Sequence, residues 1–324
     1  MKIILGTMTF SGQVDEALAT DMVSEFKRSA NDEVDTAFVY NKGETEKLLG
    51  RIHKVGALEG TRLAGKANPK ALNGLSPESV RKQMLTSLER LQMESFDLFY
   101  LHSPDLDIPV HDTLQAIAHL HDEGKFKRFG LSNYAAWQVA EIIELCNREG
   151  WIAPSVYQGM YNALTRDVER ELFACLSNYN VSFYAYNPLA GGMLSGKHQS
   201  LEQLPDEGRF ATFDGYQDRY WKPEYFKVIN EISDTCKTAD IAPAAAAIRW
   251  LIHHSALTDN SKPDATDTSP AQVDHGLILG ASSMTHLQQN IRATLDGPLP
   301  QELVDAIESG WMTVRPACIK YFRP

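Results

Sequence analysis

Short apolar runs alternate along the chain with stretches in which apolar residues recur every three or four positions. The short runs are typical of buried strands, and the longer spacing is typical of amphipathic helices. About eight strand–helix units emerge from this pattern. The predicted strands cover residues 2–8, 61–66, 96–102, 126–132, 155–158, 182–186 and 276–279, and one more strand begins at residue 34 and ends before Tyr40.

The predicted helices follow these strands, and their apolar stripes indicate which face is buried. The clearest helix start is at Ser76, whose side chain can cap, followed by Pro77 at the first helical position. Further helices are predicted from about residue 15, over 44–53 and over 112–123. The stripes comprise Leu18, Met22 and Phe26; Leu48 and Leu49; Val80, Met84, Leu88 and Leu91; Val139, Ile142, Ile143 and Cys146; Val168, Leu172, Phe173 and Leu176; and Leu287, Ile291 and Leu295.

The alternation predicts an α/β fold, a (β/α)8 TIM barrel with long loops at its C-terminal face. Barrels of this kind often run to 324 residues as one unit, so we predict a single domain over residues 1–324. A doubly wound sheet would also alternate, but it normally carries G-x-G-x-x-G after its first strand. The corresponding stretch here reads GTMTFSG, which favours the barrel.

Two stretches interrupt the strand–helix pattern. Residues 191–221 are glycine-rich and aromatic, which favours a binding loop over a simple connection. A mobile surface loop is the alternative. Residues 255–274 are rich in Asp, Thr, Ser and Pro and are predicted to be a polar loop or a partly disordered insertion.

Charge and cysteine usage narrow the class of protein. A net charge of −11 argues against nucleic acid or an anionic membrane as a partner, because both attract basic patches. Four scattered cysteines with no C-x-x-C pair indicate reduced thiols in a cytoplasmic protein. No apolar run approaches the roughly 20 residues of a membrane helix, and the apolar start is too short for a signal peptide. We therefore expect a soluble protein.

Chemically active residues stand at the ends of three successive predicted strands. Asp35 lies inside the second, Lys66 closes the third and His102 ends the fourth, with Tyr40 just beyond Asp35. A carboxylate on a buried strand needs a cationic partner, and Lys66 is the candidate. In a parallel barrel these strand ends share the rim that carries the active site. The four residues therefore predict a proton-transfer site.

The same residues resemble the catalytic tetrad of the aldo-keto reductases. The matching segments are VDTAFVY with Asp35 and Tyr40, LAGKANP with Lys66, and FDLFYLHSPD with His102. The resemblance continues through GLSNY, YQGMYN and YAYNPLAGGMLSGK, and NPLAGG and the ending YFRP look most like the branch that reduces aflatoxin dialdehyde and succinic semialdehyde. It implies NADPH-dependent reduction of aldehydes, or of reactive ketones and dialdehydes, with Tyr40 as general acid. Lys66 is expected to lower the pKa of Tyr40, and His102 to orient the carbonyl and share in the proton relay.

The resemblance also assigns cofactor and substrate residues, with NADPH/NADP as the implied cofactor. Ser132, Asn133 and Gln158 resemble the group that binds the nicotinamide carboxamide, and Tyr186 the ring on which the nicotinamide stacks. Residues 187–197 resemble the loop around the pyrophosphate. The full set implied for the cofactor is Ser132, Asn133, Gln158, Tyr186, Asn187, Pro188, Leu189, Gly191, Gly192, Lys197, Arg209, Gly280, Ser282, Ser283, Gln288 and Asn290. Tyr40, His102 and Arg323 are the implied substrate-binding residues, with a frayed terminal tail as the alternative for Arg323.

One position departs from the family pattern. Gly280 stands where many members carry a basic residue for the adenosine 2′-phosphate. We therefore predict that Arg209 and Lys197 supply the charge, with Ser282 and Ser283 donating hydrogen bonds at a helix start. Arg219 is a weaker candidate.

Other readings fit the residues less well. The stretch 191–197 spells G-x-x-x-x-G-K, but His198 follows where a phosphate loop needs Ser or Thr. No metal site is predicted, because the close histidine pairs 119/121 and 253/254 lack partners at ligand spacing and are expected on helix surfaces. A nucleotide-binding regulatory module with little turnover stays open as the alternative to an enzyme, and a homodimer as the alternative to a monomer.

Overall fold

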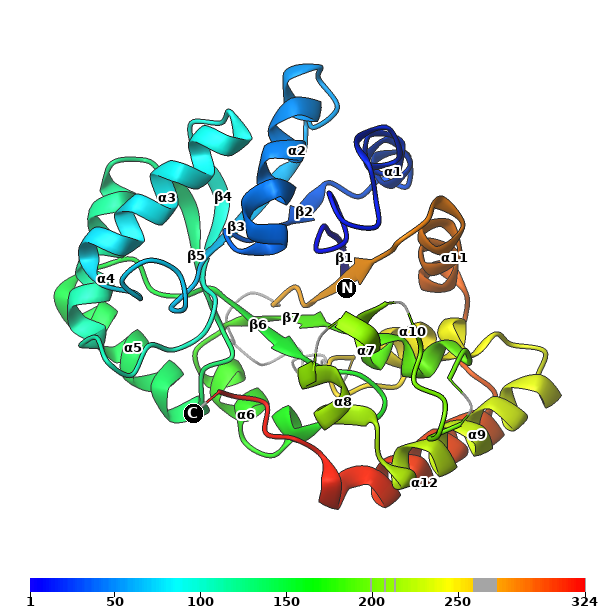
Figure 1. Ribbon diagram of the computed structural model, residues 1–324. Helices are drawn as coiled ribbons and strands as arrows, with labels where there is room; N and C mark the ends of the chain where they lie inside the picture. The colour runs from blue at the N-terminus through cyan, green and yellow to red at the C-terminus, as the bar shows by residue number, and fades with distance from the viewer. Residues whose placement is uncertain (199, 207, 213, 259–272, 324) are drawn as a thin grey trace, which may run out of the picture.

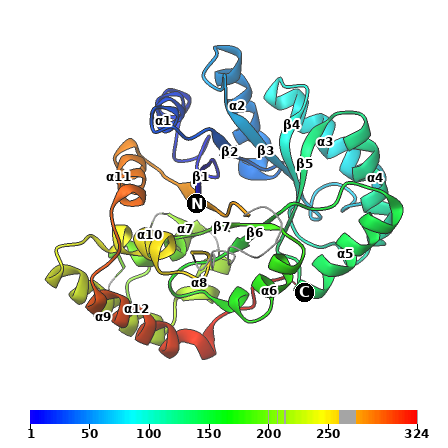
Figure 2. The same ribbon diagram turned by 180° about the vertical axis from the view of Figure 1, so that it is seen from behind.

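Eight parallel strands close into one barrel in chain order, so that β8 pairs with β1 (Figures 1 and 2). The computed structural model describes residues 1–198, 200–206, 208–212, 214–258 and 273–323. The predicted (β/α)8 barrel is confirmed. The strands are β1 Lys2–Gly6, β2 Glu33–Asp35, β3 Arg62–Ala67, β4 Phe96–Leu101, β5 Phe126–Ser132, β6 Val156–Met160, β7 Ser182–Tyr186 and β8 Gly276–Gly280.

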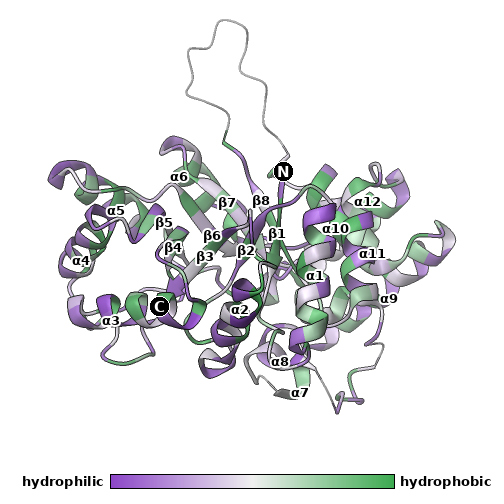
Figure 3. Cartoon of the chain, turned by 90° about the horizontal axis from the view of Figure 1, so that it is seen from above, coloured by the Kyte–Doolittle hydropathy of each residue, from purple (hydrophilic) through white to green (hydrophobic). Residues whose placement is uncertain are grey.

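Most helices surround the strands as an outer ring (Figure 1), whereas the short α7 and α8 lie at one end of the barrel (Figure 3). The helices are α1 Glu16–Arg28, α2 Glu44–Lys54, α3 Pro77–Leu91, α4 Val110–Asp122, α5 Ala136–Glu149, α6 Leu172–Asn178, α7 Arg209–Thr212, α8 Asp214–Tyr220, α9 Pro223–Thr238, α10 Pro243–His253, α11 Met284–Leu295 and α12 Gln301–Val314. Short 3-10 turns add η1 Tyr40–Gly43, η2 Asp167–Glu169, η3 Ala190–Ser195 and η4 Arg315–Ala317. None of the helices in the described ranges is long and apolar enough to cross a membrane.

Local signals explain where several helices begin. The Ser76 side chain accepts a hydrogen bond from the Ser79 amide and Pro77 is the first residue of α3, as predicted. Ser283 caps α11 in the same way, by accepting from the His286 amide. These side chains satisfy amides that have no partner within the helix.

Some helix predictions were wrong or missing. Leu295 is 74% exposed, because each four-residue step advances about 40° around a helix and carries the third member of its stripe away from the core. α4 begins two residues before the predicted start. The region 191–221 is partly helical, since it contains η3, α7 and α8. α9, α10 and α12 were not predicted, and most of the polar insertion 255–274 lies outside the described residues.

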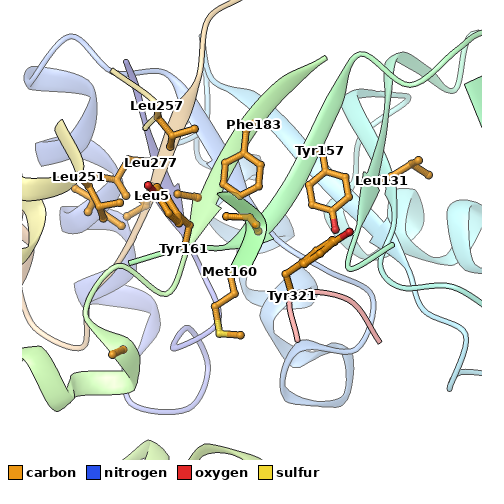
Figure 4. Packing of buried hydrophobic residues seen from close by; sticks show 14 of the residues in the cluster. Leu5, Leu131, Tyr157, Met160, Tyr161, Phe183, Leu251, Leu257, Leu277 and Tyr321 are labelled. Carbon is orange, nitrogen blue, oxygen red and sulfur yellow. The ribbon is translucent and has the colours of Figure 1, made fainter. Parts of the chain in front are cut away.

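Two apolar layers hold the barrel together. The larger lies between strands and helices, where residues such as Leu5, Phe183 and Leu251 pack (Figure 4). The smaller fills the barrel interior with side chains from six strands: Ile4, Ala64, Leu98, Tyr100, Val156, Tyr184 and Ile278. The interior is therefore a packed core and not a pore.

A cluster of charged residues fills the N-terminal end of the barrel. The buried Glu33 carboxylate lies 3.0 Å from Arg62 Nη1 and 3.4 Å from Arg128 Nη2, and it accepts a hydrogen bond from the Tyr184 hydroxyl at 3.2 Å. Side chains two apart on a strand share a face. Asp35, two residues after Glu33, therefore points into the barrel at its other end, where α7, α8 and the C-terminus lie (Figure 3).

Candidate active site

Backbone pairing brings the predicted catalytic residues to one end of the barrel. The Thr36 amide donates to the Ala64 carbonyl at 2.9 Å, and the His102 amide donates to the Ala67 carbonyl at 2.8 Å. These bonds extend the β2–β3 and β3–β4 ladders past the strand ends. Asp35, Lys66 and His102 consequently face the same small volume above the interior core.

The Lys66 ammonium is buried against Asp35. Lys66 is fully buried, and its Nζ donates to Asp35 Oδ1 at 2.5 Å and to the Thr36 carbonyl at 2.6 Å. Burial lowers the pKa of Lys66, and the Asp35 carboxylate opposes that shift. The side chain is thereby held in one orientation, with Nζ 5.1 Å from the centre of the Tyr40 ring.

Gln158 has a contact that was not predicted. Its Nε2 donates to Asp35 Oδ2 at 2.9 Å, so both carboxylate oxygens of Asp35 are occupied. Gln158 is buried on β6, on the far side of the barrel from β2. Its amide therefore links Asp35 to the region assigned to the nicotinamide carboxamide.

Tyr40 lies beyond the end of the second strand, as predicted. β2 ends at Asp35, and Tyr40 begins η1, where Asn41 and Lys42 have φ of 46° and 58°. The loop is tied down on both sides, because Asn41 Nδ2 donates to the Phe10 carbonyl at 2.6 Å and Arg90 Nη1 donates to the Phe38 carbonyl at 3.2 Å. These contacts fix the approach of the Tyr40 ring to the site.

The ionisation of Tyr40 differs from the prediction. Burial raises the pKa of Tyr40, and the Asp35 carboxylate raises it further, whereas Arg209 and Arg323 act in the opposite direction. The predicted net lowering does not occur, because burial and the Asp35 carboxylate, which is bonded to Lys66 at 2.5 Å, outweigh the effect of the Lys66 cation. The Tyr40 hydroxyl therefore carries its proton at neutral pH.

His102 lies beside Tyr40, with ring centres 6.1 Å apart and planes at 80°. Burial, the Lys66 cation and Arg323 hold the pKa of His102 well below its usual range. The imidazole is consequently neutral. It can orient a carbonyl by hydrogen bonding, but it is not a cationic proton source.

The residues assigned to the nicotinamide end gather next to His102. Asn133 Nδ2 donates to the His102 carbonyl and to Ser132 Oγ, both at 2.9 Å, and its Oδ1 accepts from the Tyr186 hydroxyl at 2.8 Å. Asn133 has a φ of 64°, which turns the chain at the end of β5. Its amide is therefore largely engaged within the protein and holds the Tyr186 ring in place.

The loop assigned to the pyrophosphate follows β7 directly. Asn187 Oδ1 accepts from the Gly191 amide at 2.6 Å, which closes a tight turn that includes Pro188 and Leu189. Gly191 and Gly192 have φ of 73° and 113°, a region that favours glycine. A Cβ on Gly191 would lie 2.5 Å from the Tyr216 ring. The two glycines are needed for this turn to form.

Arg209 reaches the position where the family pattern is broken. A Cβ built on Gly280 would lie 3.6 Å from Arg209 Nη2, so the guanidinium occupies the space beside the end of β8. The Lys197 cation acts on His286 in the first turn of α11, where it lowers the pKa of that histidine together with burial. Ser282 and Ser283 begin this helix, Asn290 is buried on it, and Gln288 is exposed. The Arg209 guanidinium thus lies beside the end of β8, and the Lys197 ammonium acts on the first turn of α11.

The terminal tail is anchored and not frayed. The Arg323 amide donates to the Asn133 carbonyl at 3.0 Å, and the buried Tyr321 hydroxyl accepts from the Ala136 amide at 2.9 Å and donates to Glu171 at 2.7 Å. Figure 4 shows the Tyr321 ring beside Tyr157. The exposed Arg323 side chain lies close enough to Tyr40 and His102 to act on their pKa values.

Sequence reasoning missed Asn68, a buried residue that contacts His102. The signal was available, because Asn68 follows Lys66 by two positions and so shares its face at the end of β3. His253 and His254 lie half-buried at the end of α10, where they bond the Asp296 carbonyl and the Leu299 amide. Within the described residues, no group of His, Cys, Asp and Glu side chains could hold a metal ion.

Comparison with known proteins agrees with this geometry. A profile of the Aldo/keto reductase family matches residues 2–311. Human aflatoxin B1 aldehyde reductase member 2 is 44% identical over 99% of this chain and 89% of its own length, and the rat protein of that name is 44% identical over 99% and 87%. Human aldo-keto reductase family 7 member A3 is 43% identical over 99% of this chain and 96% of its own. The chain therefore belongs to the aldo/keto reductase family.

Proposed function

We propose that this chain reduces aldehydes to alcohols with NADPH and that Tyr40 donates the proton to the carbonyl oxygen. The observation that carries this proposal is the buried Lys66, bonded to Asp35 at 2.5 Å, with the Tyr40 ring 5.1 Å from Nζ and the His102 ring 6.1 Å from that of Tyr40. NADPH, when bound, supplies a hydride to the carbonyl carbon.

The chain's own residues then have separate roles. Tyr40 enters the reaction protonated, because burial raises its pKa. As its proton moves to the carbonyl oxygen, the Lys66 ammonium favours the developing phenolate. His102, being neutral, donates a hydrogen bond that orients the carbonyl. Asp35 and Gln158 hold Lys66 in place.

The surrounding residues fit a phosphorylated dinucleotide. The glycine turn at 191–192 lets backbone approach a pyrophosphate closely. Arg209, beside Gly280, and Lys197, near the first turn of α11, would hold the 2′-phosphate with Ser282 and Ser283. Tyr186, held by Asn133, would stack on the nicotinamide. The positive charge of Arg209 and Lys197 supports a preference for NADPH over NADH.

The substrate class follows from the site and from the relatives. Two of the relatives are named for the aldehyde of aflatoxin B1. Arg209, Arg219 and Arg323 all act on the pKa of Tyr40 or Tyr186, so the mouth of the site carries positive charge. We propose that Arg323 pairs with a carboxylate on the substrate, as succinic semialdehyde has.

Turnover separates this proposal from the regulatory alternative. NADPH consumption is measured with a panel of uncharged aldehydes, succinic semialdehyde and ketones, and each is ranked by kcat/KM. The proposal expects aldehyde-dependent consumption of NADPH. Tight binding of NADPH with no turnover of any aldehyde would instead support a regulatory module.

A further inference from the structure

The side chain of Asn68 contacts the Nδ1 nitrogen of the His102 ring. Asn68 follows β3 directly and is 8% exposed, and its Nδ2 lies 3.2 Å from His102 Nδ1. The Lys70 amide donates to Asn68 Oδ1 at 2.8 Å. An amide oxygen only accepts and an amide nitrogen only donates, so the NH2 group must face the ring. Nδ1 of His102 therefore accepts and carries no proton.

Gln83 holds Asn68 from behind. Gln83 is fully buried on α3, and its Oε1 accepts from the Asn68 amide at 2.8 Å. Its Nε2 donates to the Asn68 carbonyl at 3.1 Å, to the Gly74 carbonyl at 3.2 Å and to Ser79 Oγ at 3.2 Å. Pro69 further restricts Asn68 to an extended backbone. Both backbone polar groups of Asn68 are thus fixed by one side chain.

We propose that Asn68 and Gln83 are positioning residues that keep His102 in the tautomer protonated at Nε2, so that Nε2–H is presented to the substrate carbonyl. This inference rests on the proposed function. The carbonyl oxygen takes its proton from the Tyr40 hydroxyl, and His102 keeps its own proton throughout. A neutral imidazole has one donor and one acceptor nitrogen, and the partner of one decides the role of the other.

The charges around His102 agree with this assignment. Lys66 from β3 and Arg323 from the terminal tail both disfavour a cationic ring, and Tyr40 from the loop after β2 carries no charge while protonated. From β5, Asn133 contacts the His102 backbone and not its ring. Because the ring is neutral, the contact with Asn68 does not set its charge, and what it sets is which ring nitrogen carries the proton.

The tautomer is measured directly by two-bond ¹H–¹⁵N NMR on protein labelled at histidine nitrogen. The chain has ten histidines, so the His102 signal is assigned by its loss in His102→Gln. We expect an unprotonated Nδ1 and a protonated Nε2, unchanged from neutral pH to below 6.5.

Two variants test the role of Asn68. Asn68→Leu removes the donor, so His102 should show both tautomers and kcat/KM should fall about tenfold, the equivalent of one lost hydrogen bond of about 1.4 kcal/mol, while NADPH binding is kept. The isosteric Asn68→Asp places an acceptor at Nδ1, which should move the proton to Nδ1 and add an ionisation to the pH profile of kcat/KM. Asn73→Leu and Asn73→Asp make the same changes at an exposed position of the same loop and should alter neither readout.

A wild-type His102 protonated at Nδ1 would overturn the proposal. So would an Asn68→Asp protein, which keeps the size of the side chain, with the wild-type tautomer and pH profile. The NMR spectra report the tautomer whether or not the enzyme turns over a substrate. A wild-type enzyme inactive on every aldehyde but with the expected tautomer would reject the proposed function and leave the assignment of Asn68 standing.

Discussion

Replacing Lys66 by Met should destabilise the protein strongly, because it leaves an unpaired carboxylate inside the barrel. Lys66 is fully buried, and its Nζ is bonded to Asp35 Oδ1 at 2.5 Å and to the Thr36 carbonyl at 2.6 Å. Methionine has nearly the same length and no charge. After the change, Asp35 keeps the Gln158 amide as its partner at 2.9 Å.

The size of the effect follows from the burial of both groups. Breaking a buried ion pair by removing one partner costs about 3–5 kcal/mol, because the other charge stays buried. Lys70→Met, at an exposed position just beyond β3, should stay within about 0.5 kcal/mol of wild type. Adding Asp35→Asn to Lys66→Met removes the stranded charge, so the double variant should regain part of the loss.

Urea unfolding measures these differences as shifts of the midpoint at constant slope. If Lys66→Met lowers the free energy of unfolding by less than about 1 kcal/mol, which is the range of solvent-exposed ion pairs, then Lys66 and Asp35 do not form a buried ion pair. A double variant whose loss equals the sum of the single losses would show that the two side chains do not interact.

Three further predictions concern the cofactor, the substrate and pH. Arg209→Ala should reduce the preference for NADPH over NADH by about ten- to a hundredfold, mainly by weakening NADPH; fluorescence titration that finds both nucleotides equally bound by wild type would contradict this. Arg323→Ala should raise KM for succinic semialdehyde far more than for an uncharged aldehyde, with the exposed Lys320→Ala as control, and equal effects on both substrates would make Arg323 structural. In the folded protein the pKa of His102 lies well below 6.5, so as the pH drops below 6.5 the unfolded chain takes up the proton first and the free energy of unfolding should fall. In His102→Gln, unfolding measured at several pH values should show a smaller fall of this free energy towards acid pH. An equal fall in the variant and the wild type would contradict the lowered pKa of His102.

Residues on strand ends could be predicted from the sequence because their spacing is simple. The alternation of apolar runs led to the barrel, and a barrel brings successive strand ends together, so Asp35, Lys66 and His102 were expected to meet. The position of Arg209 beside Gly280 was predicted in a different way. A missing basic residue on β8 implied that another side chain supplies the charge, and the long loop after β7 was the available source.

Other features depend on three-dimensional contacts that no local pattern encodes. The path of the chain to Tyr40 was not predicted: β2 ends at Asp35, and the chain turns through Asn41 and Lys42, both with positive φ. Gln158 reaches Asp35 across the closed barrel, over a separation of 123 residues. The pKa of Tyr40 depends on burial, which outweighs a neighbouring cation already paired with Asp35. Each of these results needed the packed structure.

The most direct test of the account is the turnover of Tyr40→Phe with saturating aldehyde and NADPH, measured beside its affinity for NADPH. The change removes one hydroxyl and keeps the ring that lies near Lys66 and His102. If Tyr40 donates the proton, kcat should fall by about two to four decades, the range expected for loss of a general acid, while NADPH binds as it does to wild type. Near-normal turnover by Tyr40→Phe would contradict the central claim.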